Sequence, residues 1–346
     1  MAKTERTRCS SYLESGVATT VVRGSRIGML LLIVILANCG ILHAQRESRH
    51  SPEGLTAELS KTTLASQQQE EIIKAIRAHK YSHAEELLLA EIDRSPHSSE
   101  TLRILGGVFF LDGKYLNSAI AYKKAEAITP LDPPSRYTLS MAYIILGHPD
   151  WARPELEAMA RSDPHNALYP YWLSRLDYDA MRFNQAVDEA LRAIQLDSSF
   201  TKAYGNLGLC YEGLGQYDKA IGAYQSAIRL DEKSPSPSPW PPLNLGALLV
   251  RLDRLDDARK SIVKALRIDP KFPNAHFQLG LILERQGKYE ESLKELQEAV
   301  QSNPSYADPY YVLGQVYQRL GEKDKAEASL RSFQKLKSTA SNREPY

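Results

Sequence analysis

The stretch GNLGLCYEGLGQYDKA, residues 205–220, decides the fold of this chain, because it carries four glycines in a segment that otherwise favours helix. A glycine inside a helix costs about 0.5–1 kcal/mol relative to alanine, so a structural gain must offset it. A phosphate-binding loop would supply that gain by bringing backbone close to an anion. A second helix that packs unusually close would supply it as well.

The same pattern recurs along the chain, mostly at intervals of 34 residues with one step of 38. The leucine-glycine or leucine-serine pairs are Leu105-Gly106, Leu139-Ser140, Leu173-Ser174, Leu207-Gly208, Leu245-Gly246, Leu279-Gly280 and Leu313-Gly314. A small residue follows in each unit, at Ala84, Ser118, Ala152, Ala186, Ala220, Ala258, Ser292 and Ala326. Several slots that repeat in register indicate a repeat protein.

This pattern resembles the tetratricopeptide repeat. Eight units fit it, at 65–98, 99–132, 133–166, 167–200, 201–234, 239–272, 273–306 and 307–340. The resemblance implies an all-α fold, a right-handed superhelical solenoid of antiparallel helix pairs. Each helix would have about 12–14 residues, too short to be stable alone, so stacking of the units must stabilise them.

The repeat explains the glycines of the opening stretch. Gly208 and Ala220 are expected to face each other where the two helices of a pair cross. Gly215 is expected to turn the chain between them, since glycine reaches left-handed conformations at low cost. Tyr217 and Tyr224 are expected to fill the space around the crossing. No anion is needed, and the helix-hairpin explanation is preferred.

Composition and motifs argue against several classes of function. A net charge of +1 over 346 residues is unlike the basic excess of nucleic-acid-binding proteins. The three cysteines include no CxxC pair, so no metal site is expected. HExxH, GxSxG and glycine-rich phosphate loops are missing from the sequence. We therefore expect no enzyme activity and no cofactor.

An apolar run, IGMLLLIVILANCGIL at 27–42, follows Arg23 and Arg26 and predicts a leader over residues 1–44. Three forms of this leader stay open: a signal peptide cleaved after Ala44, a retained membrane anchor, or a lipoprotein signal acylated at Cys39. All three place the rest of the chain outside the cytoplasm, either periplasmic or secreted. Residues 27–44 would then be the only membrane contact, as a tether.

The leader is followed by a predicted polar linker at 45–64, the solenoid at 65–340 and a tail at 341–346. The segment SPSPSPWPP at 234–242 adds four residues between two units and predicts a loop insertion that can act as a flexible break. At the other end, an apolar edge is expected to support self-association of the chain. Its residues are Leu330, Phe333 and Leu336.

In the tetratricopeptide family the first helix of each pair lines a concave groove, and the resemblance places nine residues there. They are Tyr137, Tyr171, Trp172, Asn206, Asn244, Phe277, Gln278, Tyr311 and Gln315. Asn206, Asn244 and Gln278 share one slot in three successive units, and such a row of amides can bind the backbone of an extended peptide. Alternatively, the amides solvate a helix face, and the aromatics pack between repeats.

The sequence therefore predicts a scaffold that binds an extended peptide or a partner protein in its concave groove. Two alternatives stay open: a carbohydrate-binding protein of the cell envelope, since aromatic and amide side chains also suit sugar rings, and a noncatalytic subunit of an envelope enzyme complex.

Overall fold

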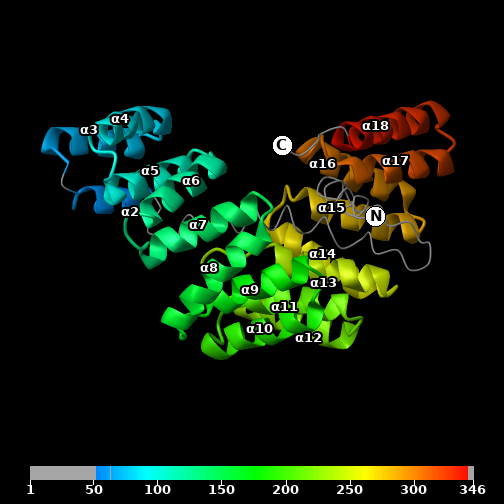
Figure 1. Ribbon diagram of the computed structural model, residues 1–346. Coiled ribbons are helices and arrows are strands. Elements are labelled where there is room, and N and C mark those ends of the chain that lie inside the picture. The colour runs from blue at the N-terminus through cyan, green and yellow to red at the C-terminus, as the bar shows by residue number, and fades with distance from the viewer. Residues whose placement is uncertain (1–51, 63, 342–346) are drawn as a thin grey trace, which may run out of the picture. The chain divides into compact units, whose positions relative to one another are not determined.

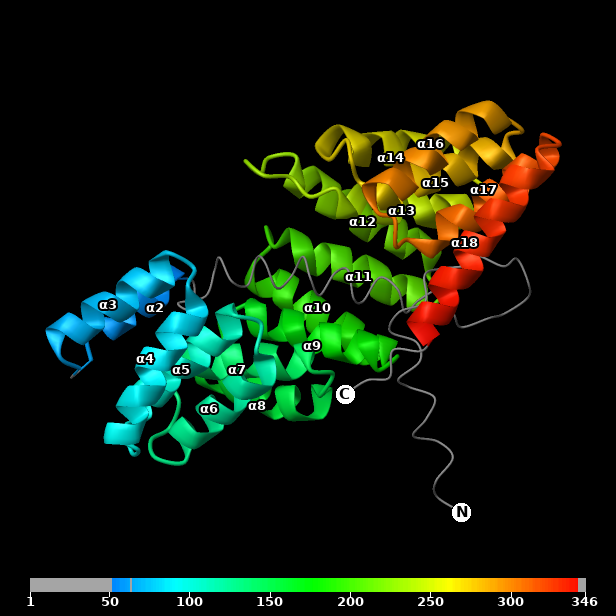
Figure 2. The same cartoon turned by 90° about the horizontal axis from the view of Figure 1, so that it is seen from above.

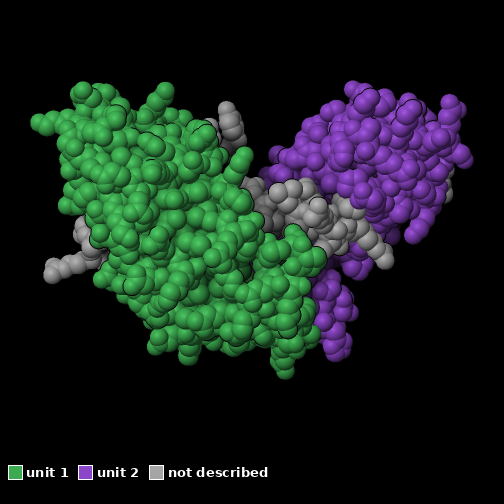
Figure 3. All heavy atoms as spheres, turned by 180° about the vertical axis from the view of Figure 1, so that it is seen from behind, with its two compact units in different colours: residues 1–34, 177–346 green, residues 35–176 purple. Residues whose placement is uncertain are grey.

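The computed structural model describes residues 52–62 and 64–341, and these residues form seventeen helices and no strand (Figure 1). They fall into two compact units, 52–176 and 177–341 (Figure 3). The first unit contains α2 Pro52–Leu59, α3 Ser66–Arg77, α4 Tyr81–Arg94, α5 Ser99–Leu111, α6 Tyr115–Glu126, α7 Pro133–Ile145, α8 Pro149–Ser162 and most of α9 Leu168–Asp179. The second contains α10 Phe183–Leu196, α11 Thr201–Gly213, α12 Tyr217–Asp231, α13 Trp240–Arg251, α14 Leu255–Ile268, α15 Pro273–Arg285, α16 Tyr289–Ser302, α17 Ala307–Arg319 and α18 Lys323–Ser341.

Every predicted repeat contains two of these helices, an odd-numbered A helix followed by an even-numbered B helix. An A helix packs against the B helix of its own repeat, as α11 does against α12 and α15 against α16. The B helix then packs against the next A helix, as α12 does against α13 and α4 against α5. From α3 to α8 and from α10 to α18, helices adjacent in sequence are therefore adjacent in space (Figure 2).

The turn between the A and B helices has the same backbone conformation in all eight repeats. The residue at the fifteenth position of each repeat lies in this turn and has a positive φ. Five of these residues are glycines, Gly113, Gly147, Gly215, Gly287 and Gly321, and the other three are His79, Met181 and Asp253. At Gly215, which has a φ of 70°, two hydrogen bonds end helix α11. The Gly215 N–H donates to the Glu212 carbonyl and the Gln216 N–H to the Tyr211 carbonyl, both at 2.9 Å. The predicted role of Gly215 is confirmed.

The glycines at the helix crossings are required by close packing. A Cβ added to Gly208 would lie 2.4 Å from Cε1 of Tyr224, and one added to Gly280 would lie 2.7 Å from Cγ of Leu296. The predicted close approach is confirmed, but the residue opposite the glycine is the large one sixteen positions later. The small residue twelve positions later lies beside the glycine carbonyl, and Ser292 donates to that of Gly280 at 2.8 Å.

The two tyrosines of the opening stretch differ in their environments. Tyr224 is fully buried against Gly208, as predicted. Tyr217 is 44% exposed, so the prediction that it fills the crossing is wrong. Tyr217 is the first residue of α12, and helical side chains point toward the N-terminus, so its ring extends beyond the helix start.

Part of the segment predicted as a polar linker, 45–64, is a helix. Residues 52–59 form α2, in which Leu55 and Leu59 are fully buried. This helix packs against α3 and α5. The leucines are four residues apart, so they lie on one side of the helix, and burial against these neighbours overrides the polar composition of the segment.

In the proline-rich segment 234–242, residues 234–239 form a loop and residues 240–242 are the first turn of α13. The helices on either side stay in contact, because α12 and α13 pack against each other. The Asp231 carboxylate accepts a hydrogen bond from the Ser238 N–H. The Trp240 and Phe272 rings pack edge to face, with their centroids 4.9 Å apart. The division between the two units lies instead within α9, after Leu176.

The leader, with its cleavage, anchoring and acylation alternatives, lies outside the described residues. Among the helices of residues 52–62 and 64–341, none combines the length and apolar character that a membrane crossing requires. At the C-terminal edge, Leu330 lies against Gly314 and the Phe333 ring packs 5.3 Å from that of Tyr311. Leu336 is half-buried. Leu330 and Phe333 thus contact α17 of their own chain.

Candidate partner-binding face

Four A helices, α11, α13, α15 and α17, belong to the unit 177–341, and the side of these helices that carries the predicted amides is called the A face here. Asn206 on α11 and Asn244 on α13 are buried, and Gln278 on α15 is half-buried. The side-chain oxygen of Asn244 has no hydrogen-bond partner among the described residues. A buried carbonyl without a donor costs about 1–3 kcal/mol, and this oxygen is closed to a ligand because it is itself buried.

Three arginines occupy a second repeated slot on the A face. Arg251, Arg285 and Arg319 are the last residues of α13, α15 and α17, and all three are exposed. Each arginine stands seven residues after the amide slot, which is two helical turns, so it lies on the same side about 10 Å further along the axis. These arginines were not among the predicted site residues, although their spacing of 34 is the period of the repeat.

Two of these arginines link consecutive A helices. Arg251 forms an ion pair with Glu212 of α11. Arg285 donates from Nη1 to the carbonyl of Val250 on α13 at 2.8 Å. A positive charge at a helix C-terminus is also favoured by the helix dipole. A guanidinium has five donors, and the Arg251 side chain remains 47% exposed, so the row can still bind an anion.

The other predicted residues of this unit lie at different depths. Phe277 is buried, with its ring 5.3 Å from that of Tyr306. Tyr311 is half-buried, and Gln315 is exposed and donates from Nε2 to the Tyr311 hydroxyl at 3.2 Å. Gln278, Tyr311 and Gln315 therefore reach the surface, whereas Asn206, Asn244 and Phe277 do not.

Asp308, at the start of α17, is a buried carboxylate that the sequence analysis missed. Its nearest recorded partner is Lys337, with Nζ 3.6 Å from Oδ1, and neither carboxyl oxygen accepts a hydrogen bond from the described residues. Burial raises the pKa of Asp308 to about 6, and the attraction of Lys337 opposes this rise only in part. An isolated aspartate within a helix gave no signal in the repeat pattern.

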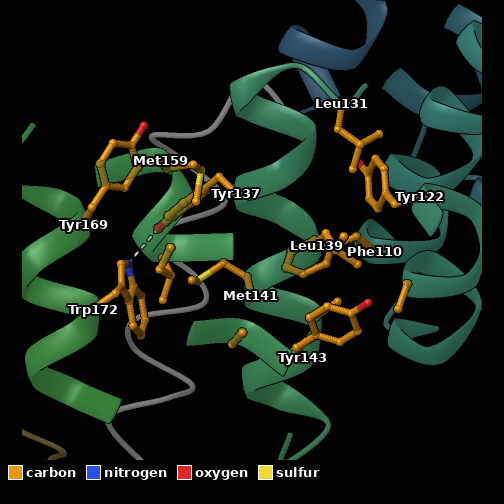
Figure 4. Close-up of a cluster of buried hydrophobic side chains, with 14 of the residues drawn as sticks. Phe110, Tyr122, Leu131, Tyr137, Leu139, Met141, Tyr143, Met159, Tyr169 and Trp172 are labelled. Carbon is orange, nitrogen blue, oxygen red and sulfur yellow. Dashed lines mark hydrogen bonds between the residues drawn. The ribbon is translucent and has the colours of Figure 1, made fainter. Parts of the chain in front are cut away.

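In the unit 52–176, the three predicted aromatics form part of a buried cluster. Trp172 on α9 donates from Nε1 to the hydroxyl of Tyr137 on α7 at 2.8 Å, and both side chains are buried (Figure 4). Their neighbours include Met141 and Met159. Tyr171 is half-buried, with its ring 5.4 Å from that of Trp172. Tyr137 and Trp172 thus connect two A helices within the core.

Metal chemistry has no evident site in this part of the molecule. The described residues hold no group of three or more histidine, cysteine, aspartate or glutamate side chains that are placed to bind a metal ion. Cys210 of α11 is buried and forms no disulfide with another described residue.

Comparison with known families accounts for the repeated slots. Models described as tetratricopeptide repeat match residues 71–133, 201–234 and 307–339, and a model described as TPR repeat matches 246–287 and 282–321. Together these matches cover more than half of the chain. The chain is a tetratricopeptide repeat protein.

This tetratricopeptide repeat protein is similar to parts of larger proteins. It is 27% identical over 197 residues to anaphase-promoting complex subunit 3 of Schizosaccharomyces pombe, a match that covers 54% of this chain and 28% of that protein. It is 23% identical over 220 residues to the CTR9 homolog of Arabidopsis thaliana, which covers 52% of this chain and 20% of the relative. The chain thus spans less than a third of the length of these relatives.

Solved structures share the fold. A tetratricopeptide repeat protein from Parabacteroides merdae has a TM-score of 0.59 at 15% identity, covering 76% of this chain and 98% of its own. The anaphase-promoting complex hetero-tetramer Cut9-Hcn1 has a TM-score of 0.57 at 17% identity, covering 81% of this chain and 55% of its own. The all-α solenoid predicted from the repeats is therefore confirmed.

Proposed function

We propose that this chain is a noncatalytic scaffold that binds a segment of a partner protein along the A face of residues 177–341. Repeat stacks present a long rigid surface, on which many modest contacts add up to a useful affinity. The sequence relative from Schizosaccharomyces pombe is by name a subunit of a multiprotein complex, which supports an assembly role.

The observation that carries this proposal is the pairing of an accessible amide and an arginine on α15 and again on α17. Gln278 is followed by Arg285 after seven residues, and the exposed Gln315 is followed by Arg319 after four. Amides can bind the backbone of an extended peptide whatever its sequence, and guanidinium groups bind carboxylates. The preferred ligand is therefore an extended segment with acidic side chains.

The test is fluorescence anisotropy with labelled peptides from an acidic, extended library, measured on the full chain. Gln278→Ala and Arg319→Ala are expected to weaken binding by about tenfold each, near the 1.4 kcal/mol that corresponds to that factor. Lys294→Ala is the matched control, because Lys294 is an exposed lysine on the B helix α16.

The salt dependence separates a specific face from general charge attraction. Binding of the acidic peptides to the unaltered chain is expected to weaken as ionic strength rises, and Arg319→Ala should reduce that slope. An equal loss of affinity in Lys294→Ala, or no loss in Gln278→Ala and Arg319→Ala, would refute the A face as the binding surface.

We also propose that the scaffold acts outside the cytoplasm, tethered or released by its leader. The support is the apolar run at 27–42 with Arg23 and Arg26 before it. Protease added to intact cells whose outer barrier has been opened is expected to digest the chain. Full protection from the protease, with digestion after lysis, would contradict this location.

A further inference from the structure

The short helix α2 occupies a surface that belongs to the first two repeats. It packs against α3 and α5, which are consecutive A helices. Leu55 and Leu59 have no exposed surface and share a core cluster with Ile76 of α3 and Ile104 of α5. The surface of α3 and α5 beneath α2 is called the α2 seat.

The α2 seat differs from an ordinary contact between repeats. A B helix packs against the A helix that follows it, as α4 does against α5 and α6 against α7. Helix α2 instead contacts two consecutive A helices, so it lies along the A side of the first two repeats. In the unit 177–341, the A helices α13 and α15 contact each other directly.

The chemistry of α2 matches that of an amphipathic helix bound in a groove. Its inward side carries two leucines four residues apart, and Thr56 between them satisfies its hydroxyl by donating to the Glu53 carbonyl at 2.9 Å. Glu53 and Ala57, on the opposite side, are exposed. Binding of an apolar helix side through residues at i and i+4 is a known mode of peptide recognition.

Helix α2 is stable only while it is docked on the α2 seat, so an undocked α2 unfolds and leaves the seat exposed. Eight residues are too few for an isolated helix to be stable in water. Burial of two leucines favours docking, but this gain does not exceed the conformational-entropy cost of fixing eight residues, so α2 is held weakly. The connection to α3 is short and is held by Gln69, whose Nε2 donates to the Thr62 carbonyl at 2.8 Å.

We propose that α2 is a built-in ligand, and that the α2 seat is a docking site for an amphipathic helix of a partner protein with leucines at i and i+4. The partner helix displaces α2 and takes the places of Leu55 and Leu59. This proposal concerns the unit 52–176 and does not rest on the proposed function of residues 177–341.

The test uses the full chain and a fluorescent peptide of residues 52–62, PEGLTAELSKT, as the probe. The variant Leu55→Glu/Leu59→Glu is expected to release α2, and Ala57→Glu on the exposed side is its matched control. If α2 is seated more than nine-tenths of the time, release raises the affinity for the peptide at least about tenfold. A peptide with both leucines changed to alanine is expected not to bind.

Trypsin cleavage after Lys61 gives an independent measure of the release of α2. Lys61 is exposed and lies in the loop that follows α2. Cleavage is expected to be faster in Leu55→Glu/Leu59→Glu than in Ala57→Glu. If the double variant loses its helical circular dichroism, Leu55→Ala/Leu59→Ala takes its place with the same expectations.

Three results would overturn the proposal. One is equal affinity of the wild-type chain, the double variant and Ala57→Glu for the peptide. Another is the absence of binding to a variant whose cleavage at Lys61 shows that α2 is released. The third is unchanged cleavage in both double variants, because the leucines would then not hold α2 in place.

Discussion

Substitution of Gly208 by alanine tests how close the helices cross within a repeat. The added Cβ would lie 2.4 Å from Cε1, 2.6 Å from Cδ1 and 2.8 Å from Cζ of Tyr224. All three distances are too short for carbon atoms in contact, so the ring or the helix must move. The ring has little freedom, because Tyr224 is fully buried and its hydroxyl donates to Glu212.

Gly205 provides the matched control in the same helix. A Cβ added there meets no atom within 4 Å. Gly205→Ala should therefore stabilise the chain by about 0.5–1 kcal/mol through helix propensity alone. Gly208→Ala receives the same gain but must relieve overpacking, which costs about 1–3 kcal/mol. The difference between the two variants isolates the steric cost, because the gain in helix propensity cancels.

Urea unfolding followed by circular dichroism measures this difference. With a denaturant slope of about 2 kcal/mol/M, Gly208→Ala is expected to unfold at a urea concentration about 0.5–1.5 M below that of Gly205→Ala. Equal midpoints for the two variants would refute the close crossing as the reason for glycine at this position.

Three further predictions concern the turn, the crossing and a buried charge. Met181→Gly should stabilise the chain by about 0.5–1 kcal/mol in thermal unfolding, because Met181 has a φ of 57° and an exposed side chain. Ser118→Ala should destabilise it by about 0.5–1.5 kcal/mol in urea, because its hydroxyl donates to the Gly106 carbonyl at 2.7 Å. Asp308 has a folded pKa of about 6, above its ordinary value of 3.8, so the stability it contributes is full below pH 3.8 and lost as pH rises through 6. Asp308→Asn should therefore gain stability relative to wild type between pH 4 and pH 7, approaching about 3 kcal/mol, and parallel pH profiles of the two proteins would contradict this.

The sequence predicted the features that every repeat shares. The leucine-glycine pairs, the small residue twelve positions later and the turn glycine each appear several times. Chance does not repeat a pattern in register so often, so these residues indicate a shared structural role. The turn also shows how far this reasoning reaches. His79, Met181 and Asp253 adopt the left-handed conformation at the slot that glycine fills elsewhere, so only alignment of the repeats could have placed them in the turn.

Structural features that occur only once in the chain could not be predicted from the repeat pattern. Leu55 and Leu59 stand in a polar segment, and two leucines are too few to show a helical period. The burial of Asn206 and Asn244 was missed for a related reason, because periodicity gives the side of a helix but not the depth at which a neighbour covers it. The arginines of the A face repeat at the right interval, and a slot-by-slot comparison would have found them.

Each close crossing joins residues that are only sixteen positions apart, as Gly208 and Tyr224 are. Such short-range contacts form before distant parts of the chain need to meet, and proteins dominated by them fold quickly. A helix pair can therefore close as soon as its own residues have been synthesised, and the next pair can then add to it. Assembly of the stack would follow the direction of translation.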